Sequence, residues 1–579
     1  MGHSCGLLKM LFFLLISSWY GVCGVVLREE MEGAPADDEL FELSIVHWND
    51  FHARFEETSW SSGACPEGRE DSCVGGIARV RTEVLRLLAE RPENSVLLNA
   101  GDVFQGTLWY TLFRWNVTAR FMNMLPHDAL VLGNHEFDHG IEGVVPFMKN
   151  VNFPVVVCNI DDSDEPTFQG LYNKSIVIER AGRKIGIVGF ILSTTNEIAA
   201  TGRLRFLDEA EAVGAEVEEL KARGVDVVIA LSHAGYDIDQ QVARKVPDLD
   251  VIVGGHSHSL LFTGTPPGGD VSRGPYPTVV EHDDGRKVLV VQAGAYTKYL
   301  GHLVVNFSSA GEPVSWAGNP ILMNTSITQD PEVLAAMEPY RNEVKAIGDT
   351  QVGSTKVLLG RSCSIGECNL GSMLTDAMVE EYVNRAPENA WTYAPIAILN
   401  SGGIRAAIVE TNDGKITYND LVTAQPFDNS VDTMELQGKH LLEALEQSVS
   451  SPWSSGDNNL AAPRSTARQF SGYGFLQYSG VRVTYNVSRP VGSRVQELGL
   501  LCDECLVPEY RALDPDKWYR VAIASFLAGG GDGFRVFPDN MRNHVTGRTD
   551  VEIFMEYLTK HSPIIQGEDG RITVIQEGE

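Results

Sequence analysis

Short apolar runs separated by polar loops recur through the first half of the chain, and their length is typical of β-strands. The runs predicted as strands cover residues 43–48, 95–100, 129–132, 184–190, 226–232 and 250–253. Helices are predicted between them, over residues 76–90 and 207–222. Strands that alternate with helices in this order indicate an α/β domain built on parallel strands.

Side chains that can bind metal ions directly follow five of these strands. They are Asp50 and His52, Asp102, Asn134, His233, and the pair His256 and His258. The carboxyl ends of the strands form the ligand-binding edge of an open α/β sheet. One histidine at such an edge is more often structural, but structural roles do not explain five strand ends that all carry Asp, Asn or His.

Seven candidate ligands are too many for one four-coordinate ion, and their mixture of nitrogen and oxygen donors suits a site for two cations. Two cations about 3.5–4 Å apart can hold a phosphoryl group between them for in-line attack. Asp102 is the predicted bridging ligand, because the two oxygens of one carboxylate can bind both ions.

Residues 133–140, with the sequence Gly-Asn-His-Glu-Phe-Asp-His-Gly, follow the apolar run 129–132 and begin where a strand gives way to a loop. Asn134 offers a carbonyl oxygen and His135 an imidazole nitrogen, so the pair can contact a metal and a substrate oxygen together. Asp138 can hold the imidazole in one tautomer or stabilise its protonated form. The alternative is a turn followed by a helix cap, with a histidine on the surface.

The chain has 579 residues, which is too long for one hydrophobic core, so two domains are expected. Its hydrophobic content of 43% is that of a globular protein. The net charge of −31 argues against a nucleic acid or an anionic membrane as a partner, because both attract surfaces rich in Lys and Arg. A small phosphate compound can still bind if metals or a few buried arginines supply positive charge locally.

Residues 1–24 have the features of a secretory signal peptide: Lys9 precedes an apolar run, and small residues stand near position 24. A short buried N-terminal helix is the alternative. No later segment is long and apolar enough to span a bilayer, and residues 567–579 are too polar for a lipid-anchor signal. We therefore expect a secreted, extracellular protein without a membrane anchor. Five N-x-Ser/Thr triplets agree with a glycoprotein on that route, at Asn116, Asn173, Asn306, Asn324 and Asn486.

Seven cysteines remain after removal of the predicted signal, and six of them form three close pairs in the sequence. The pairs are Cys65 and Cys73, Cys363 and Cys368, and Cys502 and Cys505. In an oxidising compartment such pairs are expected to form disulfides. The third pair has the C-x-x-C spacing, which also occurs in redox and zinc motifs. Cys158 is left over inside an apolar run and is expected to be a buried free thiol.

A helix is predicted over residues 330–347, because Asp330 can cap it and Pro331 suits its first turn, and it would connect the two domains. Beyond it, another helix is predicted over residues 371–384, and three loop features can bind a ligand. These features are Asn400 with Gly403 and Arg405, Phe427, and Phe526 with Asp532. Glycines allow close approach of the backbone, Arg405 can bind a phosphate, and two aromatic rings could hold a flat base between them. Considered singly, each feature is also explained by a glycine turn or a core aromatic.

The order of the strand-end motifs, D-x-H, G-D, G-N-H-E-x-D, H and G-G-H-S-H, resembles that of the calcineurin-like metallophosphoesterases. Over about residues 42–575 the chain resembles their 5′-nucleotidase/apyrase family, because the loop features of the second half match that family as well. The resemblance implies an α/β (α+β) fold with two domains and a linker. These would be a four-layer α/β/β/α metallophosphoesterase domain at 42–329, a linker helix at 330–352, and a C-terminal α/β nucleotide-binding domain at 353–579.

The resemblance also implies roles for single residues. One metal would be held by Asp50, His52, Asp102 and His258, and the other by Asp102, Asn134, His233 and His256. His135 with Asp138 would be the catalytic dyad. The substrate would be bound by Arg54, Asn134, Asn400, Gly403, Arg405, Phe427, Phe526 and Asp532. Among these, the two phenylalanines would stack on the base, Asn400 would bond the base, Asp532 the ribose, and the two arginines the phosphate.

The resemblance implies a secreted two-metal hydrolase that acts as an apyrase on extracellular ATP and ADP, with blocking of platelet activation as a candidate role. Hydrolysis of AMP, as by 5′-nucleotidases, is the alternative. An arginine commonly follows the first cysteine of the Cys363 loop in this family, and Ser364 stands there instead, which weakens the case for a strict AMP preference. A non-catalytic extracellular nucleotide-binding protein is a third hypothesis, but it would need a broken metal set.

The expected cofactors are two divalent metal ions, zinc in the first place, with manganese, calcium or magnesium as alternatives. The expected partner is a small nucleotide rather than a nucleic acid. The protein would be a monomer or a homodimer.

Overall fold

The computed structural model describes residues 40–576 apart from 61, 66, 67, 69, 389, 409–412, 428, 451–473, 503 and 506. The predicted signal peptide, residues 1–24, lies outside the described residues, as does Asp428, which directly follows Phe427. All described residues belong to one unit of mutually contacting elements that begins at Leu40.

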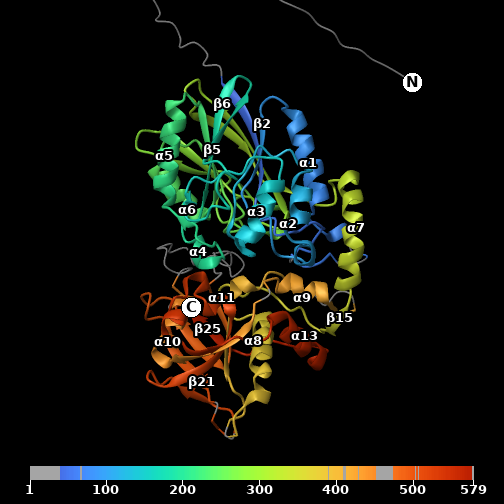
Figure 1. Cartoon of the computed structure of the whole chain (residues 1–579), viewed down its shortest axis with the longest axis vertical. Helices are drawn as coiled ribbons and strands as arrows, with labels where there is room; N and C mark the ends of the chain where they lie inside the picture. Colours follow the sequence, from blue (N-terminus) through green and yellow to red (C-terminus); the bar gives the residue numbers. More distant parts are fainter. Residues whose placement is uncertain are drawn as a thin grey trace, which may run out of the picture. The chain divides into compact units, whose positions relative to one another are not determined.

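Two six-stranded sheets form the first half of the described chain (Figure 1). The first has the order β13-β12-β1-β2-β3, with β14 paired to β12; its strands are β1 (Phe41–Trp48), β2 (Ser95–Asn99), β3 (Ala129–Leu130), β12 (Tyr299–Phe307), β13 (Pro313–Gly318) and β14 (Ile321–Leu322). The second has the order β10-β11-β9-β8-β6-β5; its strands are β5 (Ser175–Arg180), β6 (Arg183–Ile191), β8 (Val227–His233), β9 (Val251–Val253), β10 (Thr278–Glu281) and β11 (Lys287–Val291). The six strands predicted from the sequence are thus confirmed as β1, β2, β3, β6, β8 and β9.

Parallel pairing brings the ends of these strands together. β1, β2 and β3 run parallel, as do β6, β8, β9 and β11. Every residue of β2 and of β8 is buried, as expected for apolar strands that are covered on both faces. In the first sheet Trp48 pairs with Asn99, and Asn99 pairs with Leu130. The loops that follow β1, β2 and β3 therefore leave the sheet at the same edge.

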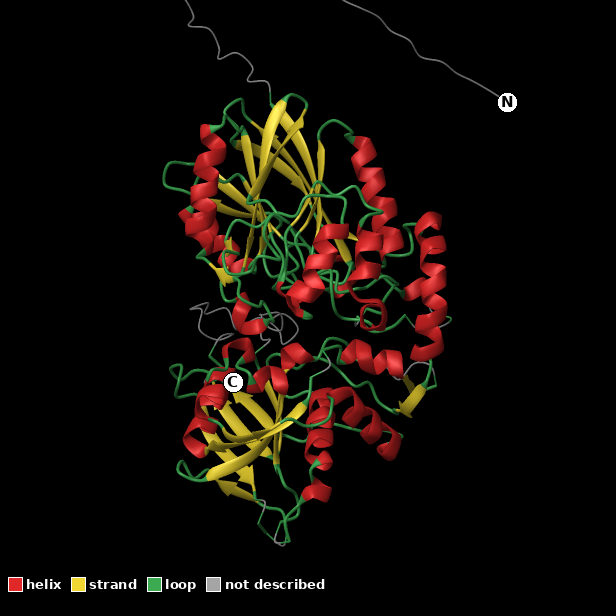
Figure 2. Ribbon diagram, viewed as in Figure 1, coloured by secondary structure: helices red, strands yellow, loops and turns green. Residues whose placement is uncertain are grey.

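Helices cover the outer faces of the two sheets. α5 (Glu209–Ala222) packs on β6 and α6 (Tyr236–Lys245) on β11, whereas α1 (Ile77–Glu90) packs on β1 and β2. Figure 2 shows both sheets between α5 and α1, so the layers follow the order α/β/β/α. The remaining elements of this half are α2 (Leu108–Met122), α3 (Gly140–Asn150), α4 (Thr195–Ile198), β4 (Ile160–Asp161), β7 (Arg205–Phe206), η1 (Glu70–Ser72), η2 (Asn134–Phe137) and η3 (Pro267–Gly269).

Capping and pairing explain where two predicted boundaries shift. The helix predicted from residue 207 begins only after Asp208, because the Asp208 carboxylate accepts the Glu211 N–H at 3.0 Å and caps the helix. The strand predicted over residues 129–132 pairs with β2 only at its first two residues. After these residues the chain enters the loop that carries Asn134, so the apolar run is longer than the paired strand.

α7 (Pro331–Gly348) is the connecting helix that the sequence predicts, and the Asp330 carboxylate caps it by accepting the N–H groups of Glu332 and Val333. Beyond it, a five-stranded sheet has the order β19-β16-β23-β18-β24, a four-stranded sheet has the order β22-β21-β20-β25, and β15 pairs with β17. The strands are β15 (Gln351–Ser354), β16 (Ile396–Asn400), β17 (Lys415–Thr417), β18 (Val431–Gln437), β19 (Leu476–Ser479), β20 (Val481–Asn486), β21 (Val495–Leu501), β22 (Tyr510–Ala512), β23 (Trp518–Ala524), β24 (Arg542–Val545) and β25 (Ile572–Ile575).

The first helix of the second half after α7 is the one predicted over residues 371–384. It is α8 (Asn369–Glu381), which starts at the Cys368 cap and is followed by η4 (Val383–Arg385). The others are η5 (Ser401–Gly403), α9 (Tyr418–Ala424), α10 (Gly438–Ser448), α11 (Ser525–Ala528), η6 (Gly531–Gly533), α12 (Val536–Asn540) and α13 (Asp550–His561).

The predicted cysteine chemistry is confirmed, and one of the five N-x-Ser/Thr triplets lies at a buried asparagine. Disulfides join Cys65 to Cys73, Cys363 to Cys368 and Cys502 to Cys505, while Cys158 is a buried free thiol. The C-x-x-C pair therefore forms a disulfide rather than a zinc site. The Asn486 side chain is only 3% exposed and its amide donates to Gln496 Oε1, so the folded chain leaves no room for a glycan there.

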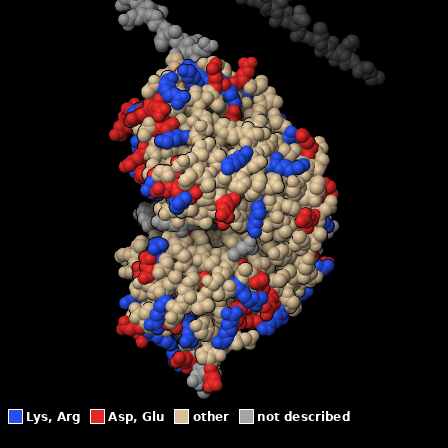
Figure 3. Space-filling model, in the orientation of Figure 1, with Lys and Arg blue, Asp and Glu red and all other residues tan. Residues whose placement is uncertain are grey.

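Charges of both signs are interspersed on the face of the molecule drawn in Figure 3, and no continuous basic surface is seen there. This pattern agrees with the net charge of −31. Among the helices that the structure describes, none combines the length and the apolar character needed to cross a membrane.

Candidate active site

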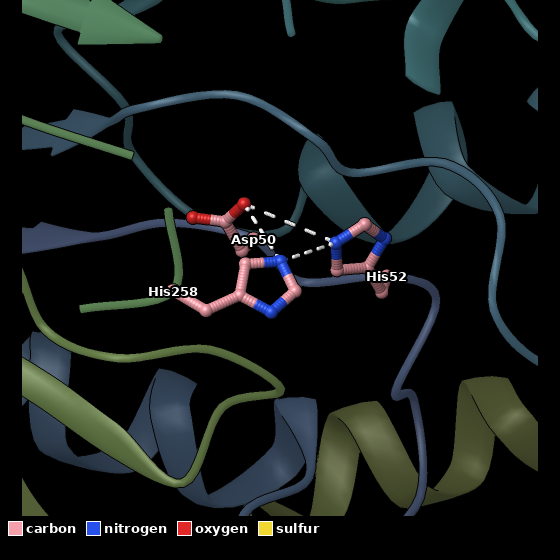
Figure 4. Close-up of side chains that lie close together, drawn as sticks. All are labelled: Asp50, His52 and His258. Atoms are coloured by element: carbon pink, nitrogen blue, oxygen red, sulfur yellow. Dashed lines mark hydrogen bonds and ion pairs between the residues drawn. The ribbon is translucent and has the colours of Figure 1, made fainter. Parts of the chain in front are cut away.

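The loops after β1 and β9 bring Asp50, His52 and His258 into one group (Figure 4). His258 Nε2 lies 3.1 Å from Asp50 Oδ1 and 3.0 Å from His52 Nε2. The Asp50 and His52 side chains are almost completely buried, and His258 is partly exposed. Each residue offers one atom to a common point, because these ligand atoms lie within 4.8 Å of one another. The group can therefore hold a metal ion, as the sequence predicts.

A second group of the same kind contains Asp102, His233 and His256, from the ends of β2, β8 and β9. His233 Nε2 lies 3.1 Å from Asp102 Oδ2. Asn134 joins the group through its side-chain oxygen, which is 2.9 Å from His256 Nδ1. The two groups adjoin, since His52 Nε2 is 3.7 Å from the same Asp102 oxygen. All seven predicted ligands thus lie at one edge of the two sheets, with Asp102 between the groups.

The tautomers of the histidines fit cations at this site. His233 Nδ1 lies 2.5 Å from the Ala100 carbonyl oxygen and His52 Nδ1 lies 3.2 Å from the Gln105 carbonyl oxygen. A carbonyl oxygen only accepts, so each Nδ1 carries a proton, and Nε2 is the ring atom that faces the Asp102 carboxylate, where a metal ion or, on His233, a proton can bind. Lone pairs and a carboxylate that converge in this way are the arrangement that a divalent cation stabilises.

The charges in this cluster perturb the pKa of its members strongly. Burial disfavours the imidazolium of His233, yet the nearby Asp102 and Asp50 raise its pKa to about 10. Burial also disfavours the carboxylate of Asp102, but His233, His135 and His52 hold its pKa well below its usual range. For His256, burial and the positive charge of His233 lower the pKa to about 3, which leaves a neutral imidazole that can bind a metal.

Two glycines let the loops approach this closely. Gly101 has φ +85°, and a Cβ atom there would lie 2.8 Å from His233 Nδ1. A Cβ atom on Gly133 would collide with Asp102 Oδ1. Any larger residue at either position would push apart the loops that carry Asp102 and Asn134.

Glu136, to which the sequence pattern gives no role, ties two of these loops together. Its buried carboxylate accepts the backbone N–H groups of Asp102, Val103, Phe104 and Gly133 at 2.5–3.1 Å. Burial and the negative charge of Asp102 nevertheless raise its pKa to about 7. Glu136 is therefore a positioning residue that fixes the loop after β2 against the loop after β3.

His135 and Asp138 form the predicted pair. His135 Nδ1 lies 2.7 Å from Asp138 Oδ2, and the His135 backbone N–H donates to Asp102 Oδ1 at 2.9 Å. Burial disfavours the His135 imidazolium, but Asp138 and Asp102 together raise the pKa of His135. On the other ring nitrogen, Arg405 Nη2 approaches His135 Nε2 at 2.8 Å. An arginine can only donate, so Nε2 accepts and Nδ1–H donates to Asp138.

One cavity of about 900 Å³ is lined by residues from both halves of the chain. Near the candidate metal groups it is lined by Asp102, Asn134, His135, Asp138, His256 and His258. Residues of the second half that line it include Asn400, Gly403, Arg405, Phe427, Phe526 and Asp532, all of them predicted from the sequence. Asn400 donates to Asp532 Oδ2 at 2.8 Å, and burial raises the pKa of the Asp532 carboxyl. All the predicted substrate-contact residues except Arg54 therefore face the same space.

Two predicted residues, Phe427 and Arg54, have contacts that the sequence did not predict. Phe427 stacks on the His135 ring at 5.3 Å between centroids and also lies under the Arg405 guanidinium. Arg54 is fully buried and does not line the cavity; its guanidinium lies 4.7 Å from the centre of the Tyr296 ring. The sequence reasoning missed Tyr296 and Arg361, which lie beside Arg54, since neither belongs to a recognisable motif.

Two sequence profiles match the chain. The profile of the calcineurin-like phosphoesterases matches residues 43–260, and that of the 5′-nucleotidase C-terminal domain matches residues 347–539. The chain belongs to the 5′-nucleotidase family. Like other calcineurin-like phosphoesterases, members of this family hydrolyse phosphoric esters with a dinuclear site for divalent metals, and the two groups of ligands described above lie where that site is expected.

Relatives from distant organisms match this 5′-nucleotidase family member over almost its full length. An apyrase from Tabanus yao is 44% identical and covers 96% of this chain and 98% of its own. The 5′-nucleotidase of Bos taurus is 40% identical, and the match covers 92% of this chain and 91% of that protein. The crystal structure of a 5′-nucleotidase precursor from Thermus thermophilus superposes with a TM-score of 0.82 at 36% identity, covering 92% of this chain and 99% of that one.

Removal of metal is expected to destabilise this family member. Without cations, the Asp50 and Asp102 carboxylates and the lone pair of His52 converge with only the proton on His233 to compensate them. A metal present at about 100 times its Kd stabilises a fold by about 3 kcal/mol, which corresponds to about 6–12 °C in Tm for a domain of about 150–250 residues. Differential scanning calorimetry before chelation, after chelation and after add-back measures this shift. An unchanged Tm in all three samples would contradict a metal at these residues.

Proposed function

We propose that this chain is a secreted two-metal nucleotide phosphohydrolase, an apyrase that releases phosphate from extracellular ATP and ADP. The observation that carries the proposal is the shared cavity of about 900 Å³. It joins the candidate metal groups and His135 to Asn400, Phe427, Phe526 and Asp532. A nucleotide has the same two-part chemistry, with an anionic end for cations and a flat, hydroxylated end for aromatic rings and polar side chains.

In this proposal each residue has the role that its surroundings support. Asp50, His52, Asp102 and His258 would hold one cation, and Asp102, Asn134, His233 and His256 would hold the other. When bound, two divalent cations supply Lewis-acid activation of water and neutralise phosphoryl oxygens. Zinc is the proposed metal, because four histidines and two carboxylates suit a borderline-soft ion.

His135 is proposed to move a proton during the reaction. In the structure His135 Nε2 accepts from Arg405, while Asp138 holds the opposite nitrogen. A substrate phosphate would compete for the Arg405 guanidinium, since charged phosphate is a stronger acceptor than imidazole. The released Nε2 could then carry a proton, which Asp138 favours, and give it to the leaving oxygen.

For the nucleoside end we propose that Phe427 and Phe526 stack on the base, Asn400 bonds its edge and Asp532 accepts from the ribose. Gly403 permits close approach of the backbone beside Asn400, whose side-chain oxygen would lie 3.3 Å from a Cβ atom at that position. The proposed domains are residues 42–329, the linker 330–352 and residues 353–579. A signal peptide at residues 1–24 would direct the chain to the extracellular space.

Hydrolysis of AMP to adenosine is the second candidate function. It is favoured by relatives named 5′-nucleotidase at 40% identity over 92% of this chain. Phosphate release from ATP, ADP and AMP, assayed side by side with the metal-loaded protein, separates the two. We expect release from ATP and ADP, with AMP hydrolysed at least about tenfold more slowly. Release from AMP alone would leave 5′-nucleotidase action, and binding of nucleotide without release would leave a non-catalytic binding protein.

A further inference from the structure

A cluster of positive charge with unused hydrogen-bond donors lies beside the candidate metal groups. The Arg54 and Arg361 guanidiniums lie 4.7 Å and 5.8 Å from the centre of the Tyr296 ring. Arg361 donates from Nη1 to the Arg405 carbonyl oxygen at 3.0 Å, which ties it to the arginine that contacts His135. Among the described residues, neither Arg54 nor Arg361 forms an ion pair with a carboxylate.

Two of these side chains are buried and carry hydrogen-bond donors for which the described residues provide no acceptor. Arg54 is 1% exposed, and its Nε and Nη2 have no hydrogen-bond partner in the described part of the chain. Tyr296 is 5% exposed, and its hydroxyl is likewise without a partner there. Buried donors of this kind cost free energy unless something accepts from them. Several donors and three guanidiniums close to one another fit an anion with several acceptor oxygens.

The position of the cluster indicates which anion it fits. The Tyr296 ring lies 5.5 Å from the His52 ring and 5.2 Å from the His258 ring, so the cluster adjoins the first candidate metal group. Arg361 and Arg405 come from the second half of the chain, where the nucleoside end of the cavity lies. A group held here would thus lie beside the first candidate metal group and next to Arg405, which lines the cavity.

We propose that Arg361 and Tyr296, together with Arg54, form a subsite for the phosphate next to the one that is cleaved. Arg361 and the Tyr296 hydroxyl are then specificity-determining residues that favour nucleoside di- and triphosphates over monoesters. This inference rests on the proposed function, because it assumes that the cleaved phosphate lies at the metal groups.

Kinetics of Arg361→Gln and Tyr296→Phe test the subsite. For ADP and ATP we expect kcat/KM to fall about 10- to 100-fold in Arg361→Gln and about 5- to 20-fold in Tyr296→Phe, because each variant removes a hydrogen bond to a charged oxygen. Both losses should fall mainly on KM, since the subsite binds a phosphate that does not react. For p-nitrophenyl phosphate, which has no second phosphate, the loss should stay below about threefold. Arg361→Lys should recover part of the activity on ADP.

Matched controls and an inhibitor keep the outcome clear. Arg482→Gln removes an exposed arginine that also lies over a tyrosine ring, and Tyr340→Phe removes a hydroxyl on α7; neither should change any rate. Equal losses on ADP and on p-nitrophenyl phosphate, or no loss on ADP, would overturn the proposal. If the wild type does not cleave ATP or ADP, the methylene analogue of ADP still tests the subsite, through its inhibition of p-nitrophenyl phosphate hydrolysis. Inhibition that is equal in wild type and Arg361→Gln would also overturn it.

Discussion

Replacing Asp102 by asparagine is expected to lower the rate of phosphate release by about 10³-fold or more, because removal of even one group that stabilises developing charge costs about 10²–10³-fold. The Asp102 carboxylate lies within 3.1 Å of His233 Nε2 and 3.7 Å of His52 Nε2, so it adjoins both candidate metal groups. Its other oxygen accepts the His135 N–H at 2.9 Å. Asparagine keeps the shape, but it loses the charge and turns an N–H₂ group toward one of these partners.

The initial rate with ADP and the metal content of the same sample measure this effect together. We expect Asp102→Asn to contain less than the two equivalents of metal expected in the wild type, because the variant removes a ligand common to both ions. Asp250→Asn is the matched control: Asp250 is also a buried carboxylate, but it precedes β9 and accepts the Val228 N–H at the amino ends of the strands, opposite to the candidate ligands. A wild-type rate with full metal content in Asp102→Asn would show that Asp102 does not bridge.

The strand-end ligands could be predicted because topology restricts where they lie. Once β1, β2 and β3 are recognised as parallel strands, their carboxyl ends must share an edge, and the pairing of Trp48 with Asn99 realises this. The same reasoning holds for His233 and His256, which follow β8 and β9. The order of the strands along the chain was therefore sufficient to predict that these residues share an edge, although it could not give the distances between them.

The anion cluster could not be predicted, because it depends on contacts between segments that have no fixed relation in the sequence. Arg361 is an exposed residue next to a disulfide loop, and Tyr296 follows β11 in a backbone conformation with φ +63°. Neither stands at a strand end or in a repeated spacing. Ser364, which the family resemblance singled out, provides no cation, whereas Arg361 on the same loop points its charge toward Tyr296.

Phe427 and Glu136 illustrate a second limit of prediction from the sequence, which concerns the partner of each side chain. An aromatic residue on a loop suggests stacking, and Phe427 does line the cavity, but its stacking partner in the structure is His135. The sequence pattern gives Glu136 no role, yet in the folded chain its carboxylate accepts four backbone N–H groups. In both cases residue type indicates the kind of interaction, and only the folded chain decides the partner.

Replacing His135 by glutamine is expected to lower kcat for AMP, ADP and ATP by about 10²–10⁴-fold, the range typical of a lost general acid. Asp138→Asn should cost less, about 10–100-fold, because it leaves the imidazole but removes the carboxylate 2.7 Å from Nδ1. The double variant should be no slower than His135→Gln alone, since Asp138 acts through His135. His440→Gln is the matched control, because His440 and Glu443 form a pair with the same spacing on α10, away from the cavity.

A comparison of substrates with different leaving groups tests which role His135 has. If His135 gives a proton to the leaving oxygen, the loss in His135→Gln must be largest for AMP, whose ribose alkoxide is a poor leaving group, and smallest for p-nitrophenyl phosphate, whose phenolate needs no proton. If it only stabilises charge on the phosphoryl oxygens, the loss must be the same for both substrates. The hydrogen bond from Arg405 to His135 Nε2 bears on the same point, because that nitrogen is free to carry a proton only when Arg405 has turned to the substrate. Arg405→Lys, which keeps the charge but not the planar fork, should therefore reduce the difference between the two leaving groups in addition to raising KM.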